Sequence, residues 1–343
     1  MTRTRKLLFG FIAIVLIPAL FYLLLEQGLR LLGYGKSFDY FTRIEIDGAA
    51  YFQDNPVFVQ QFYPASLDIT PLENTFSADA DDNVLRVFVL GGSAARGFPN
   101  PAHGFSRLLE AMLKNALPGR KIEVINTAMT AINSHVVYET ARSIPQDVAD
   151  FAIVLMGNNE VIGPYGPGTY NQNFLSSLGM IRALQAFKRS RIGQVMLDVA
   201  VTLEPRDHRE ELKWKGMQMF TDESVPHDDP RLATVYSHYR ENLQDIVATL
   251  QRKGAHVILS SVPVNLRHSA PFSSVHCSGV TDEQLAKWQA ASDVADARFE
   301  AGDWRAAIEH YEAALEIDPD FADTHYRLAV SYENSENFAR ASE

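Results

Sequence analysis

The sequence predicts an α/β protein built on a mainly parallel sheet, with an apolar helix before the sheet and a helical repeat after it. Three observations predict this class. Short β-branched runs alternate with stretches of helical period, an uninterrupted apolar run lies near the N-terminus, and residue pairs recur at a spacing of 34 near the C-terminus. Alternating strands and helices are typical of a parallel sheet covered on both faces, which is a three-layer α/β/α sandwich.

Composition excludes several classes of protein. The 343 residues are 46% apolar and 21% charged, which is typical of a globular chain and not of a disordered one. The formal net charge of −11 argues against broad contact with a nucleic-acid backbone. The single cysteine, Cys277, excludes an intrachain disulfide, and no cluster of Cys and His residues surrounds it. No metal and no organic cofactor is expected.

The apolar run covers residues 7–25, nineteen residues without a charge. This length just spans the roughly 30 Å hydrocarbon layer of a bilayer. Arg3, Arg5 and Lys6 precede the run and Glu26 follows it, so the N-terminus is expected in the cytoplasm. We therefore predict a single-pass anchor in the inner membrane, with the globular part in the periplasm. A cleaved signal peptide is the alternative, although its apolar stretch is usually only about 7 to 15 residues long.

The strands and helices are placed by hydrophobic pattern. Strands are predicted at 84–90, 122–125, 151–156 and 256–260. Apolar helix faces are predicted between them, at Phe105, Leu108, Leu109, Met112 and Leu113, and at Tyr236, Tyr239, Leu243, Ile246 and Leu250. The aromatic-rich segment before the first strand is predicted to be irregular. The expected organisation is a cytoplasmic tip and anchor at 1–33, an approach segment at 34–83, an α/β domain at 84–280 with an insertion at 161–230, and helical repeats at 281–343.

The repeat is carried by three pairs of residues at one offset. Asp303 pairs with Asn337, Trp304 with Phe338, and Ala307 with Ala341. This pattern resembles the helix-turn-helix of tetratricopeptide repeats, which stack on their neighbours and often bind protein partners. An ordinary amphipathic helix pair is the alternative. Because Glu343 falls in the first turn of a second repeat's second helix, we expect the chain to be truncated at its C-terminus.

Three strand ends carry residues suited to acyl chemistry. The first is Gly91-Gly92-Ser93, where a serine follows a glycine-rich turn and precedes a helix. The second, 124–131, leaves its strand through small residues, and the third, 155–160, brings two amides and a carboxylate to a strand end. Backbone N–H groups and asparagine amides stabilise a developing oxyanion. A plain helix N-cap serine and an Asn-Asn turn are the structural alternatives.

Together the three blocks resemble the SGNH (GDSL-type) hydrolase family over residues 84 to about 275. The resemblance implies that Ser93 is the nucleophile, although Gly92 replaces the acidic residue of the family block. It places Ala128 where the family has an oxyanion-hole glycine, and Asn159 at the oxyanion-hole asparagine, with Glu160 replacing the usual Asp. The chain also resembles membrane-anchored bacterial members of this family that carry tetratricopeptide repeats inserted before their final catalytic block.

A serine nucleophile needs a base, normally a histidine oriented by a carboxylate. The family supplies both from an Asp-x-x-His block, and none of the ten histidines of this chain has Asp three residues earlier. His268 and His276 follow the fourth strand and are the nearest candidates in the chain. We expect the catalytic histidine beyond residue 343.

These patterns lead to a main hypothesis and two alternatives. The main hypothesis is a membrane-anchored serine ester hydrolase that acts on an acyl or acetyl ester of a small molecule, glycan or lipid outside the cytoplasm. An O-acyltransferase acting on envelope polysaccharide would use the same site. A non-catalytic scaffold or binding protein, in which the repeats bind a protein partner, is the third possibility.

Overall fold

The computed structural model describes residues 12–79, 83–169, 174–203, 216 and 224–343. The chain divides into two compact units. The first comprises Met1–Met156, Leu175–Trp214 and Glu241–Ser260, and the second comprises Gly157–Phe174, Lys215–Arg240 and Ser261–Glu343. The basic residues Arg3, Arg5 and Lys6, the start of the predicted anchor and parts of the predicted insertion lie outside the described residues.

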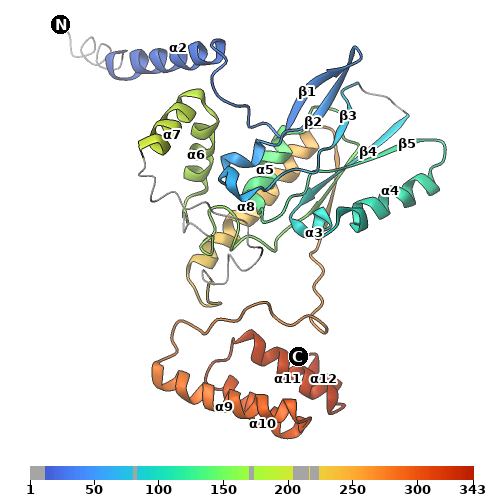
Figure 1. Ribbon diagram of the computed structural model, residues 1–343, viewed down its shortest axis with the longest axis vertical. Coiled ribbons are helices and arrows are strands. Elements are labelled where there is room, and N and C mark those ends of the chain that lie inside the picture. The colour runs from blue at the N-terminus through green and yellow to red at the C-terminus, as the bar shows by residue number, and fades with distance from the viewer. Residues whose placement is uncertain (1–11, 80–82, 170–173, 204–215, 217–223) are drawn as a thin grey trace. The chain divides into compact units, whose positions relative to one another are not determined.

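A four-stranded parallel sheet forms the centre of the first unit (Figure 1). Its strands are β4 (Val84–Gly91), β5 (Lys121–Asn126), β6 (Phe151–Leu155) and β7 (His256–Ser260), in the order β5-β4-β6-β7. These are the four predicted strands, so the mainly parallel sheet is confirmed. Every residue of β4 is buried, as expected for an inner strand of a parallel sheet.

Strand register brings the ends of three strands to one edge of this sheet. Val89 of β4 pairs with Asn126, the last residue of β5. Gly91, the last residue of β4, pairs with Leu155, the last residue of β6. The turns that follow β4, β5 and β6 therefore start from the same edge, where open α/β sheets bind their ligands.

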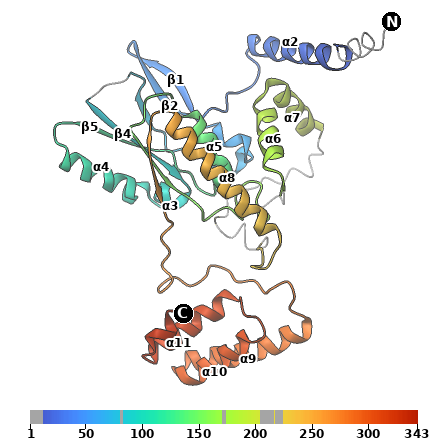
Figure 2. The same ribbon diagram turned by 180° about the vertical axis from the view of Figure 1, so that it is seen from behind.

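Among the described residues, six α-helical segments belong to the first unit besides the apolar N-terminal helix. They are α3 (Ser93–Arg96), α4 (Phe105–Ala116), α5 (Ser134–Ser143), α6 (Leu178–Arg189), α7 (Arg191–Leu203) and the C-terminal half of α8 (Arg231–Arg252). Helix α4 contacts β5, α5 contacts β4, and this half of α8 lies along α5 (Figures 1 and 2). On α4 only part of the predicted apolar face is covered, because Leu108 and Met112 remain 61% and 68% exposed.

The predicted irregular segment contains a second sheet, so that expectation was wrong. Strands β1 (Phe41–Ile46), β2 (Ala49–Asp54) and β3 (Thr75–Ser77) pair antiparallel in sequence order. Asp47 and Gly48 connect β1 to β2, and both have positive φ, as a two-residue hairpin turn of type I′ requires. The sheet is held against β4 through edge-to-face contacts of Phe41 and Phe76 with Phe88.

An apolar helix leads into the first unit. A π-helical turn at Ile12–Leu16 continues into α2 (Ile17–Leu31), and the 19 residues Ala13–Leu31 are long and apolar enough for a membrane span or a signal sequence. Its one acidic residue, Glu26, accepts hydrogen bonds from the Arg30 side chain of the same helix at 2.9 Å and from the Ile192 N–H at 3.1 Å. The carboxylate is thereby satisfied where the helix contacts α7.

The second unit contains the predicted helical repeat. Helices α9 (Asp282–Glu300), α10 (Trp304–Leu315), α11 (Ala322–Asn334) and α12 (Phe338–Ala341) follow one another, and Ala295, Ala307 and Tyr311 form a core against Phe299 and Leu328. Asp303 and Asn337, one of the recurring pairs, are the N-caps of α10 and α12. The spacing of 34 therefore repeats a helix start as well as an apolar face.

Candidate functional site

The turn that carries Ser93 requires its glycines. Gly91 has φ +155°, and a Cβ atom there would lie 1.9 Å from the carbonyl oxygen of Leu155 on the neighbouring strand. The short helix α3 then begins at Ser93 and ends at Gly97, which has φ +87°. Ser93 is half-buried as the first helical residue, so its N–H has no acceptor within the helix. The strand-turn-helix context predicted for Ser93 is present.

Ala128 lies in the turn after β5, in the same unit. It is fully buried, and its N–H donates to the Asn126 side-chain Oδ1 at 3.0 Å. The Met129 N–H donates to the Gly91 carbonyl at 3.2 Å, which ties this turn to the end of β4. The N–H that the family resemblance assigns to an oxyanion hole therefore already has an acceptor in this structure.

Asn126 joins the two turns, and sequence analysis did not single it out. Its Nδ2 donates to the carbonyl of Ala95 in α3 at 3.0 Å and to the Ser106 hydroxyl at 2.9 Å, while its Oδ1 accepts from Ala128. The side chain is only 4% exposed. A polar residue ending the apolar strand Ile122–Ile125 was the signal available in the sequence.

A second missed feature is Ala131. It has φ +58°, a left-handed conformation that favours glycine. Its carbonyl accepts a hydrogen bond from the Tyr63 hydroxyl at 2.6 Å, which fixes the turn. By backbone conformation, Ala131 therefore occupies a position that favours glycine, whereas Ala128 is not among the described residues with positive φ.

Asn74, directly before β3, and Asp54, the last residue of β2, connect the antiparallel sheet to Asn126. The Asn74 amide donates to the Asn126 carbonyl at 2.9 Å and to the Asp54 carboxylate at 2.6 Å. Asp54 is 5% exposed, and its burial raises its pKa to about 6, although hydrogen bonds from Asn74 and Tyr40 lower it. A buried carboxyl with a raised pKa is therefore connected through Asn74 and Asn126 to the turns of Ser93 and Ala128.

Asn159 and Glu160 belong to the second unit, where both are buried. They follow Gly157, which has φ +136° and faces the Tyr239 hydroxyl. Burial raises the pKa of Tyr239, and the charge of Glu160 raises it further. The Asn159 carbonyl accepts from the Gly163 N–H at 2.7 Å, so the predicted turn after β6 is present.

Of the two histidines considered as bases, His276 and His268, the first has a carboxylate partner of its own. In the second unit, His276 Nδ1 lies 2.7 Å from Oδ2 of Asp318, which is fully buried, and the ring stacks on Phe321. His268 is exposed in the loop after β7, and its backbone N–H donates to the Asn265 side-chain oxygen at 3.0 Å. His276 thus pairs with a carboxylate, but it anchors the loop before the repeat.

Cys277 lies beside two carboxylates of the second unit, those of Asp318 and Asp320. Burial, together with hydrogen bonds to Asp318 and Asp320, raises the pKa of its thiol to about 12, so it is protonated at neutral pH. Among the residues that the structure describes, no group of three or more His, Cys, Asp or Glu side chains could hold a metal ion.

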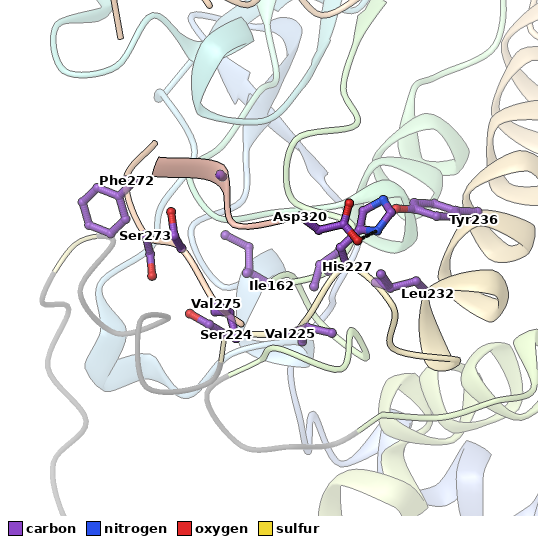
Figure 3. Close-up of a pocket in the computed structure, with 13 residues that line it drawn as sticks. Ile162, Ser224, Val225, His227, Leu232, Tyr236, Phe272, Ser273, Val275 and Asp320 are labelled. Carbon is purple, nitrogen blue, oxygen red and sulfur yellow. Dashed lines mark ion pairs between the residues drawn. The ribbon is translucent and has the colours of Figure 1, made fainter. Parts of the chain in front are cut away.

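A cavity of about 440 Å³ lies in the second unit (Figure 3). Its wall is mainly apolar, and the imidazole of His227 lies 3.7 Å from the carboxylate of Asp320 on one side. Several lining residues come from the predicted insertion at 161–230. The apolar side chains are Val161, Ile162, Val225, Leu232, Phe272 and Val275.

Comparison with known proteins identifies one part of the chain. No curated protein and no solved structure matches it. The family model of the tetratricopeptide (TPR) repeat matches residues 295–335, which cover the end of α9, all of α10 and all of α11. The chain therefore contains a TPR repeat, as the recurring pairs predicted.

Proposed function

We propose that this chain carries the nucleophile and oxyanion site of a membrane-anchored serine ester hydrolase of the SGNH type. One observation carries the proposal: the Asn126 side chain joins the turn of Ser93 to the turn of Ala128 at the edge of the sheet where β4 and β5 end. Two blocks that are separate in the sequence are thereby held in one place, as acyl-transfer chemistry requires.

In the proposed reaction the Ser93 hydroxyl attacks an acyl carbonyl and releases the alcohol, and water then hydrolyses the acyl-serine. The N–H groups of Ser93 and Ala128 and the amide of Asn159 would stabilise the oxyanion, Asn159 being assigned by the family resemblance alone. The Ala128 N–H would have to turn from Asn126 to the oxyanion or be shared between them. The serine proton passes to a histidine. The 343 residues contain no Asp-x-x-His motif that would supply this histidine.

Added imidazole can replace the histidine in a test of this proposal. The hydrolysis of p-nitrophenyl acetate by the full chain in detergent is measured against imidazole concentration, together with labelling by a fluorophosphonate probe. Imidazole alone also hydrolyses this ester, so the rate without protein is subtracted. We expect a remaining imidazole-dependent rate that Ser93→Ala abolishes and Ser143→Ala leaves intact. Asn159→Ala should lower kcat on the order of 100-fold. Equal rates in Ser93→Ala and the unsubstituted chain would refute the assignment.

The apolar helix supports the proposed membrane anchor. Residues 13–24 of this helix are all exposed. Its two charged residues, Glu26 and Arg30, form an ion pair near its C-terminal end. We propose a single span in the inner membrane with the globular part in the periplasm. Alkaline carbonate extraction and protease protection test this arrangement, and release of the chain into the soluble fraction would contradict it.

A non-catalytic scaffold is the second candidate, and two observations favour it. The TPR repeat is a common protein-binding element, and the Ala128 N–H already has an acceptor. Failure of the probe to label Ser93 even with imidazole present would favour this function. An O-acyltransferase on envelope polysaccharide differs in its acceptor alone, and acetate release without added glycan would argue against it.

A further inference from the structure

A hollow in the first unit gathers positive charge in an otherwise acidic chain. It has a volume of about 410 Å³ and is lined by Tyr138, Arg142, Arg182, Thr249, Arg252 and Lys253. Four of these six side chains are cationic, whereas the whole chain has a net charge of −11. The lining comes from α5, α6 and the C-terminal end of α8, so tertiary packing brings the charges together.

Carboxylates neutralise only two of the four cations. Arg182 pairs with Asp245 at 2.6 Å, and Arg142 pairs with Glu139 at 2.9 Å. Within the described residues, the partners of the other two cations are uncharged. Arg252 donates to the Ala248 carbonyl and the Thr249 hydroxyl at 3.1 Å each, and Lys253 donates to the Ile144 carbonyl.

The neighbouring positive charges destabilise the charged form of Lys253. Burial lowers the pKa of its ammonium group, and the neighbouring charges of Arg252 and Arg142 lower it further. An anion entering the hollow would relieve this repulsion.

Arg252 and Lys253 lie at the C-terminal end of α8, where basic side chains cap helix carbonyls. Capping leaves some of their N–H groups without an acceptor among the described residues. Basic residues at a helix C-terminus interact favourably with its last carbonyls. The hydrogen bonds described use two of the five N–H groups of Arg252 and one of the three of Lys253. Donors are therefore left over for a ligand.

Two guanidinium groups are already held in place. The Cζ atoms of Arg182 and Arg142 lie 4.6 and 5.7 Å from the centre of the Tyr138 ring. Arg142 and Arg182 use one Nη atom each for Glu139 and Asp245, whereas Arg182 Nε is buried without a hydrogen-bond partner among the described residues and could donate to an anion. Little side-chain freedom would be lost on binding.

We propose that this hollow binds a phosphomonoester dianion. Two unneutralised cations match its two charges, planar guanidinium groups match its oxygens, and the Thr249 hydroxyl adds a further polar contact. The phosphate could belong to a soluble metabolite or to a lipid headgroup. The site is independent of the proposed hydrolase function.

Binding of inorganic phosphate tests this site directly. The full chain in phosphatidylcholine nanodiscs is titrated by calorimetry, and we expect saturable binding that Arg252→Gln and Lys253→Gln each weaken by about tenfold. Arg252 is exposed, so its replacement is not expected to disturb folding. Lys114→Gln, an exposed lysine of α4, serves as the matched control and should leave binding unchanged.

The source of the phosphate is distinguished by adding phosphatidic acid to the nanodiscs, with phosphatidylglycerol discs of equal surface charge for comparison. Weaker apparent phosphate binding in phosphatidic acid discs alone supports a lipid headgroup, and equal binding in both supports a soluble ester. No saturable phosphate binding, or an equal loss in the Lys114→Gln variant, would overturn the proposal.

Discussion

Asp54 is expected to make the stability of the first unit depend on pH. Its Oδ2 accepts hydrogen bonds from the Asn74 backbone and side chain, whereas its Oδ1 is buried without a partner in the described residues. Because burial raises the pKa of Asp54 from 3.8 to about 6, the folded protein holds this proton more tightly than the unfolded chain does. The free energy of unfolding should therefore fall by about 3 kcal/mol as the pH rises from about 4 to above 6.

Asp54→Asn should remove this dependence. The asparagine keeps an oxygen for the Asn74 donors and carries no charge, so the variant should be more stable than the unsubstituted protein at pH 7 by up to about 3 kcal/mol. The difference should shrink as the pH falls towards 4. Urea unfolding of the full chain in mild detergent, followed by far-UV circular dichroism across this pH range, measures it.

The control is Asp68→Asn, which removes an exposed carboxyl of the same segment and should leave the pH profile unchanged. Parallel profiles for Asp54→Asn and the unsubstituted protein would refute the reasoning. That result would mean that the hydrogen bonds from Asn74 and Tyr40 offset the effect of burial.

Three other substitutions have expected outcomes. Gly91→Ala would press a Cβ against a carbonyl oxygen of the neighbouring strand, and it should lower the free energy of unfolding by more than about 2 kcal/mol, whereas Gly119→Ala, in open space, should change the melting temperature little. Asn126→Ala leaves the buried Ala95 carbonyl and Ser106 hydroxyl without their partner, so it should speed backbone hydrogen exchange at residues 93–98. Ser106→Ala should speed this exchange less, and equal effects of the two substitutions would contradict the role of Asn126 in joining the turns of Ser93 and Ala128. Asp303→Ala removes the N-cap of α10 and should cost about 1 kcal/mol, measured by thermal unfolding; an unchanged melting temperature would contradict this.

The main sheet could be predicted because its signals are local. Each strand is a short apolar, β-branched run ending at a turn, and the predicted bounds 256–260 agree with those of β7. The sheet at β1–β3 was missed, although Asp47-Gly48 between two strand-like runs is a typical hairpin signal. The many aromatic residues around it obscured the alternation, since they face one another in a cluster instead of marking a single face.

The candidate site could be predicted in part. The strand-end position of Ser93 followed from the glycine turn, but the role of Asn126 did not, because its partners in α3 and α4 lie 31 and 20 residues away. The left-handed backbone of Ala131 also gave no sequence signal, since alanine rarely adopts it. The pairing of His276 with Asp318, 42 residues apart, follows no motif spacing.

The sequence by itself determined the order of strands and helices, the apolar N-terminal helix and the TPR repeat with its two caps, Asp303 and Asn337. These features depend on period, turn residues and caps, which act within a few neighbouring residues. Tertiary structure alone decided which polar groups meet: Asn126 with the turns of Ser93 and Ala128, and Arg252 and Lys253 with Arg142 and Arg182. Such contacts join segments far apart in the chain, and packing, not local preference, fixes them.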